Sequence, residues 1–186
     1  MKQRPIARII FVMFLTLILG FIPSFASYAA TAKEINASVD ASMARFVREV
    51  KGANEFLKAA KGILVIPKVI QGGFIVGGEY GEGALRIGGK TVAYYNIVAG
   101  SFGLQIGGQE KDIMLVFMDD AVLKKFRASQ GWKAGVDGTV AMINTGAEGS
   151  IDTAKIKDPI VGFVFGQKGL MAGATIEGSK FTKLKK

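Results

Sequence analysis

Two pairs of carboxylates are the residues of this chain best suited to catalysis. Glu79 and Glu82 lie in a glycine-rich stretch, and Asp119 and Asp120 precede a short apolar segment. A carboxylate pair can supply a general acid and a general base, as in glycoside hydrolysis. The same spacings are typical of solvated loop charge for the first pair and of helix capping for the second. We favour this second interpretation.

The residue inventory excludes most other catalytic chemistry. The chain has no histidine and no cysteine, so it has no imidazole base, no thiol nucleophile and none of the usual zinc ligands. Ser101 follows Gly100, but the segment lacks the first glycine of a nucleophile elbow. We therefore expect no enzymatic activity, no metal site and no cofactor.

The first 29 residues have the three parts of a secretory signal peptide. Three basic residues are followed by an uncharged apolar core of 14 residues and by small residues that end at Ala29. Because a bilayer span takes about 20 apolar residues, we expect cleavage after Ala29, or alternatively after Ala32, and not a membrane anchor. The predicted product is one exported domain, residues 30–186, located in the periplasm or outside the cell.

Residues 33–61 have the only long helical periodicity. Apolar residues recur at steps of three, four and seven and form one narrow stripe. Gly52 is expected to break or kink this segment. Charged residues four apart predict two ion pairs, Arg45 with Glu49 and Lys51 with Glu55. The apolar stripe is suited to packing on a sheet, and an amphipathic helix can also lie on a bilayer.

The sequence after Gly62 is typical of a β-sheet, because short β-branched and aromatic segments alternate with glycine. The expected strands are residues 63–66, 73–87, 91–106, 113–118, 138–143, 160–165 and 170–176. The uninterrupted apolar run 113–118 predicts a strand buried on both faces, and a short helix is expected over 119–129. We predict an α+β fold, with one or two N-terminal helices packed on a curved, mostly antiparallel sheet of sandwich or barrel-like form.

Basic residues outnumber acidic ones by 24 to 15, and by 21 to 15 without Lys2, Arg4 and Arg8 of the predicted signal peptide. A net charge of +6 on the remaining chain favours anionic partners. Near an anionic membrane, each basic side chain contributes about 1 kcal/mol. The candidate lipid-binding residues are Arg45, Arg48, Lys51, Lys58, Lys124, Lys125, Arg127, Lys180, Lys183, Lys185 and Lys186.

Five blocks of glycine, aromatic and aliphatic residues resemble, in order, those of the SYLF domain, a lipid-binding family. The blocks are residues 60–67, residues 72–83, residues 103–117, Phe126 with its helix, and residues 168–179. From first to last, with the helical segment before them, the blocks extend along nearly the whole predicted domain. The sequence departs from the family at Tyr94-Tyr95-Asn96, where a Trp-Ser-x-Pro-like stretch is expected.

The resemblance implies a non-enzymatic domain that binds lipids through an N-terminal helix and a basic surface. Eukaryotic relatives bind phosphoinositides, and some bind actin, but an exported domain would meet neither. We therefore expect binding of anionic phospholipids or phosphorylated lipids at an envelope surface, and no nucleic-acid partner. Two alternatives stay open: an envelope structural protein with a protein or polysaccharide partner, and a carrier that encloses a small apolar ligand.

Overall fold

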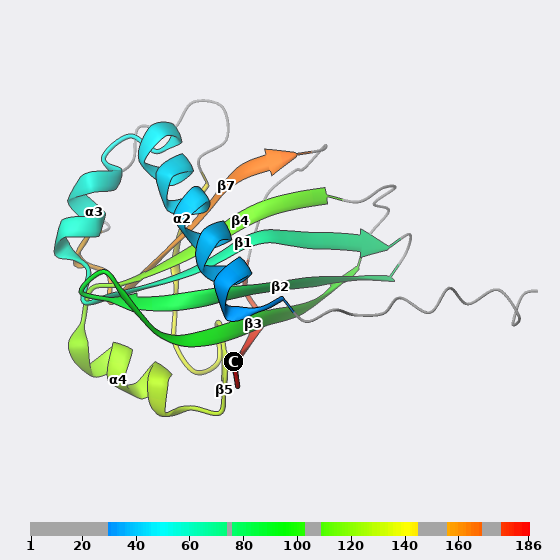
Figure 1. Ribbon diagram of the computed structural model, residues 1–186. Coiled ribbons are helices and arrows are strands. Elements are labelled where there is room, and N and C mark those ends of the chain that lie inside the picture. Colours follow the sequence, from blue (N-terminus) through cyan, green and yellow to red (C-terminus); the bar gives the residue numbers. More distant parts are fainter. Residues whose placement is uncertain (1–29, 74–75, 103–108, 145–155, 169–175) are drawn as a thin grey trace, which may run out of the picture.

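The computed structural model describes residues 30–73, 76–102, 109–144, 156–168 and 176–186 as three helices and a curled eight-stranded sheet (Figure 1). The helices are α2 (Ala32–Glu49), α3 (Ala53–Ala59) and α4 (Asp120–Ala128). The strands are β1 (Gly62–Gly73), β2 (Val76–Ile87), β3 (Lys90–Phe102), β4 (Gln109–Phe117), β5 (Gly131–Lys133), β6 (Ala141–Asn144), β7 (Ile160–Lys168) and β8 (Lys180–Leu184). The predicted α+β class is confirmed.

The strands lie in the order β5-β8-β3-β2-β1-β4-β7-β6. Every neighbouring pair is antiparallel except β6 with β7. The predicted curved, mostly antiparallel sheet is therefore confirmed, and it curls as a half-barrel. In Figure 1, α2 and α3 lie on one side of the sheet and α4 on the other. We refer to these sides as the α2 face and the α4 face.

Helix α2 begins at a capping box. The Thr31 hydroxyl accepts a hydrogen bond from the Glu34 backbone N–H (3.3 Å), and the Glu34 carboxylate accepts one from the Thr31 N–H (2.7 Å). These two reciprocal bonds satisfy backbone donors that have no partner within the helix. The bond from the Thr31 backbone holds the pKa of Glu34 below its ordinary value.

The predicted break at Gly52 is confirmed, because Gly52 adopts a φ of 78° between α2 and α3. The two predicted ion pairs within this segment are wrong. Arg45 contacts Asp112 of β4, and no carboxylate of the described residues lies within 4.0 Å of Lys51. A buried carboxylate across the interface outcompetes a solvated helix neighbour.

The apolar stripe of α2 packs on the sheet. Phe46 is fully buried and Val50 is 3% exposed, and the Phe46 ring meets Phe163 of β7 at a centroid separation of 4.8 Å. The stripe is therefore part of the protein core and is not free to enter a bilayer. Among the helices of the described residues, none combines the length and apolarity that a membrane span requires.

A second apolar layer covers the α4 face. Phe126 of α4 contacts Tyr95, Phe117 and Trp132, with ring centroids between 4.9 and 5.4 Å apart. Strand β4 lies between the two layers and is buried from Lys111 to Phe117. The predicted burial of this strand on both faces is confirmed.

The structure adds β5 (Gly131–Lys133), where no strand was expected, and corrects the expected strands at two further places. Strand β1 continues through Pro67 to Gly73, because a bulge between Ile66 and Val69 accommodates the proline. Residues 180–184, where no strand was expected, form β8 between β3 and β5. The predicted signal peptide, the strand over 170–175 and the resemblance blocks at 103–108 and 169–175 lie outside the described residues.

Gly83 of β2, beside the β1 bulge, offers a test of how closely these two strands approach each other. A Cβ atom added to Gly83 would overlap the carbonyl oxygen of Val65 and lie 2.7 Å from the Ile66 Cα. We expect Gly83→Ala to lower the free energy of unfolding by about 2 kcal/mol or more. Gly72→Ala, where a Cβ meets nothing within 4 Å, should raise it by about 0.5 kcal/mol. Urea denaturation measures both, and equal effects would contradict the close approach at Gly83.

Candidate functional site

A buried carboxylate, Asp112 of β4, connects three elements on the α2 face. Its Oδ2 atom accepts hydrogen bonds from the Ser42 hydroxyl and from the Arg45 Nη1, each at 2.8 Å. Its Oδ1 atom accepts the backbone N–H of Lys68 at 2.9 Å. Asp112 thereby joins α2, β4 and the β1 bulge at one point. The bonds compensate for the burial of its charge.

The bulge places Lys68 in an uncommon conformation. Its φ of 51° lies in the left-handed region, which no other non-glycine residue of the described chain adopts. This conformation costs an ordinary side chain on the order of 1 kcal/mol. The bond to Asp112 holds the backbone there, and the lysine side chain is exposed.

Two hollows follow the flank of α2 beside this bulge, and Lys68 lines both of them. One, of about 260 Å³, extends past Ser42 to Arg45 and Asp112. The other, of about 240 Å³, opens toward Ile70 and Tyr80 at the start of the helix. Together they form a groove between the helix and the sheet.

The candidate catalytic pair Glu79 and Glu82 is separated by the sheet. Side chains of a strand alternate between its faces, so two residues three apart point to opposite sides. Glu79 forms a buried ion pair with Lys111 (2.8 Å), whereas Glu82 forms one with Lys186 (2.9 Å). The two carboxylates therefore do not share one site. Asp119 caps α4 by accepting the Val122 N–H at 2.8 Å, so the capping interpretation is confirmed.

Glu82 also accepts the phenol hydrogen of Tyr80 at 2.7 Å. Partial burial raises the pKa of the Tyr80 phenol, and the bond and charge of Glu82 raise it further. Lys186 additionally donates to the Ala30 carbonyl oxygen at 2.7 Å. The C-terminal residue thus ties the start of the described chain to β2.

The structure divides the predicted lipid-binding residues into four groups. Arg45 is bound to Asp112 and Lys186 to Glu82, so neither cation is free for a ligand. Arg48, Lys51 and Lys58 are exposed on α2, its connection to α3, and α3 itself. The candidates on α4 (Lys124, Lys125 and Arg127) and those on β8 and the C-terminus (Lys180, Lys183 and Lys185) are also exposed.

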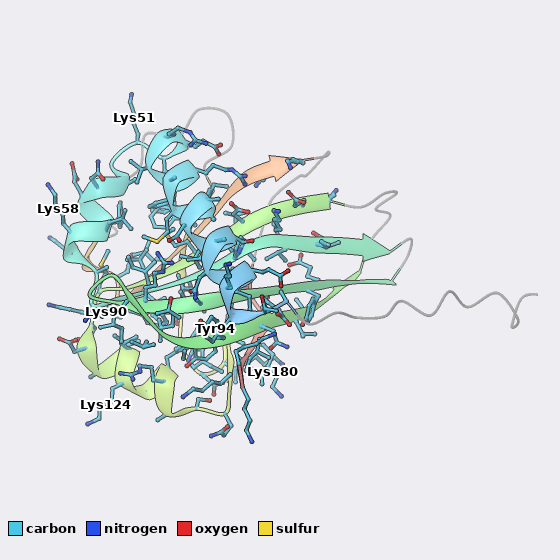
Figure 2. All side chains as sticks on the ribbon, in the orientation of Figure 1. Lys51, Lys58, Lys90, Tyr94, Lys124 and Lys180 are labelled. Atoms are coloured by element: carbon cyan, nitrogen blue, oxygen red, sulfur yellow. The ribbon has the colours of Figure 1, made fainter. Side chains whose placement is uncertain are left out.

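Four lysines from four parts of the fold project from one end of the molecule. Figure 2 shows Lys51, Lys58, Lys90 and Lys124 spread along this end, with α3 on one side of the sheet, α4 on the other and the β2–β3 turn between them. All four are exposed, and none has a described carboxylate within 4.0 Å. We call these four residues the cationic end. The sequence analysis missed Lys90, although its position after Gly88-Gly89 indicates an exposed hairpin turn.

Lys180 lies away from the cationic end (Figure 2). Within β8, Lys180 and Lys183 point to opposite faces because they are three residues apart. The basic residues at the C-terminus therefore do not form one surface with those of the helices.

One comparison with known proteins finds a family model that matches the C-terminal part of the chain. Residues 98–186 match the family model described as "Ysc84: Las17-binding protein actin regulator". This match, which begins within β3 and extends to residue 186, confirms the resemblance to the SYLF family. The description is that of a binding protein and regulator, and it names no catalysed reaction. No curated protein matches the chain.

The role of Asp112 can be tested by removing its carboxylate. Asp112→Ala leaves Arg45, Ser42 and the Lys68 N–H without their acceptor, so we expect the free energy of unfolding to fall by about 3 kcal/mol. The matched control is Glu110→Ala two residues away, whose partner Lys168 is 69% exposed. It should change stability by less than about 0.5 kcal/mol. Chemical denaturation measures both, and a small effect of Asp112→Ala would contradict this role.

Proposed function

We propose that this protein binds anionic phospholipids or phosphorylated lipids at an envelope surface, without catalysing a reaction on them. The observation that carries the proposal is the cationic end. Four exposed lysines from separate elements are spread along this end, with no described carboxylate within ion-pair distance. Unpaired lysines attract lipid phosphates, whereas lysines already in ion pairs would have to exchange partners first.

The proposed contact differs from an amphipathic helix that inserts into the bilayer. The apolar stripe of α2 is buried against the sheet, so attraction to the membrane would come from charge at the surface. Such attraction weakens as salt concentration rises, because ions screen exposed charges beyond about 10 Å at 0.1 M.

Vesicle co-sedimentation tests the cationic end. We expect binding to phosphatidylcholine vesicles only when they also contain phosphatidylglycerol. Replacing Lys51, Lys58, Lys90 and Lys124 together by glutamine should lower the partition coefficient at least about tenfold, since each charge contributes about 1 kcal/mol.

The matched control removes four exposed lysines elsewhere, namely Lys33, Lys133, Lys183 and Lys185, and so changes the net charge equally. This variant should keep most of its vesicle binding. If both variants lose binding equally, only net charge matters, and the proposed site is wrong. If neither the wild type nor the control binds anionic vesicles, the proposed function itself is wrong.

We also propose export with cleavage after Ala29. The capping box of α2 supports this position, because cleavage after Ala32 would remove Thr31 and with it both capping bonds. It would also remove the Ala30 carbonyl that accepts from Lys186. Expression of the full chain in a bacterium, followed by N-terminal sequencing of the periplasmic product, should give Ala30 as the first residue. Intact protein in the cytoplasm would contradict the proposal.

A protein partner is the second candidate function, because the family description names a protein that binds Las17. A stoichiometric protein retained on the immobilised wild type, with no effect of lipid on its binding, would favour this candidate. The third alternative, a carrier with a ligand inside the sheet, has less support. Side chains of Phe117, Phe126 and Phe181 fill the α4 face over β4 and β8.

A further inference from the structure

Three glycines stand side by side on the α2 face where no turn or close packing requires them. Gly72, Gly78 and Gly100 are direct neighbours across β1, β2 and β3. All three are exposed, and none has a φ in the left-handed region. A Cβ atom at Gly72 or Gly100 would meet nothing within 4 Å, and one at Gly78 only the Ala99 carbonyl at an ordinary 3.6 Å. Glycine weakens a strand interior and often marks a place where another molecule approaches the backbone.

The neighbouring row on the same face is apolar and exposed. Ile70, Tyr80 and Val98 lie directly opposite one another on the same three strands, two residues inward from the glycines. Their exposed fractions are 61%, 47% and 49%. We call these six residues the glycine shelf. It is a flat apolar surface that continues into the hollow lined by Ile70, Tyr80 and Lys68.

The charges around the glycine shelf favour an anionic group. Lys68 lies at its inner border, and Lys180 of β8 is opposite Val98 in the apolar row. Both lysines are exposed, and neither has a described carboxylate within 4.0 Å.

The carboxylates that border the same hollow are already engaged. Glu82 is paired with Lys186, and Glu34 is bound by Thr31. At the far border of the shelf, Glu110 is paired with Lys168. Glu82 and Glu110 are thus neutralised by lysines, whereas Glu34 keeps its charge because Thr31 is neutral. Lys68 and Lys180 together outweigh this one carboxylate, so the net charge of these groups is positive.

We infer that the glycine shelf and its hollow bind a single-chain amphiphile with an anionic head group, such as a fatty acid. The head group contacts Lys68, and the hydrocarbon chain lies over the apolar row and the bare backbone of the glycines. This arrangement accounts for an exposed apolar row, for glycines that the fold does not need, and for a lysine held in a left-handed conformation. Strand β1 begins at Gly62 beside the cationic end, and the shelf lies about ten residues further along this strand. At the rise of a β-strand, ten residues span roughly 30 Å. The site is therefore separate from the proposed membrane surface.

Isothermal titration calorimetry with laurate tests the inference. We expect the wild type to bind laurate, below its micelle concentration, at one site. Acetate, which has the head group without the chain, should show no binding. Dodecyl maltoside, which has the chain with a neutral head group, should bind about tenfold more weakly, the loss expected for one charge-assisted contact.

Two variants distinguish a loss of laurate binding from a loss of fold stability. Gly100→Thr places a side chain in open space on the shelf, so the melting temperature should stay or rise while laurate affinity falls at least about tenfold. Lys68→Gly relieves the left-handed backbone and removes the cation. It should raise the melting temperature while lowering laurate affinity about tenfold.

The quadruple cationic-end variant should bind laurate like the wild type, and Gly100→Thr should still bind anionic vesicles. The two sites can therefore fail independently. Laurate affinity that is unchanged in both Gly100→Thr and Lys68→Gly would overturn the inference. A wild-type dimer that Gly100→Thr converts to a monomer in analytical ultracentrifugation would also overturn it, because the shelf would then bind a second copy of the chain.

Discussion

The buried Asp112 carboxylate is the interaction on which the arrangement of the α2 face depends. A charge placed between a helix and a sheet requires partners on every side, and Asp112 takes them from α2 and from the β1 bulge. These bonds fix the position of the helix over the strands. They also hold the backbone of Lys68 in a conformation that it would otherwise avoid. Asp112 thereby contacts both walls of the groove beside α2, the helix and the β1 bulge.

The sheet keeps the two proposed binding surfaces apart. Its strands are long, and α2 covers only part of their length, so one end carries α3, the β2–β3 turn and α4 while the other extends beyond the helix. The first end presents lysines without described carboxylate partners, and the second presents apolar side chains beside bare backbone. A charged surface and an apolar surface attract different parts of a lipid, since head groups respond to charge and chains respond to contact area.

Particular residues show how far sequence patterns lead. The stripe of α2, the break at Gly52, the strand 113–118 and the cap at Asp119 follow from periodicity and local hydrogen bonding, and the structure confirms each of them. The predicted strands were wrong at Pro67, where β1 does not end, and at residues 180–184, which form a strand. A proline predicts the end of a strand unless a bulge accommodates it, and a lysine-rich strand at 180–184 resembles a solvated tail.

The sequence by itself determined the fold class, the absence of histidine and cysteine chemistry, and the resemblance to the SYLF family, because composition and local spacing carry this information. Only the tertiary structure decided which charges are free. Glu79 and Glu82 are neighbours in the sequence but lie on opposite faces, and Arg45 binds a carboxylate 67 positions away rather than its helix neighbour. The partners of a charged side chain depend on contacts between residues far apart in the sequence, and local spacing does not predict these contacts.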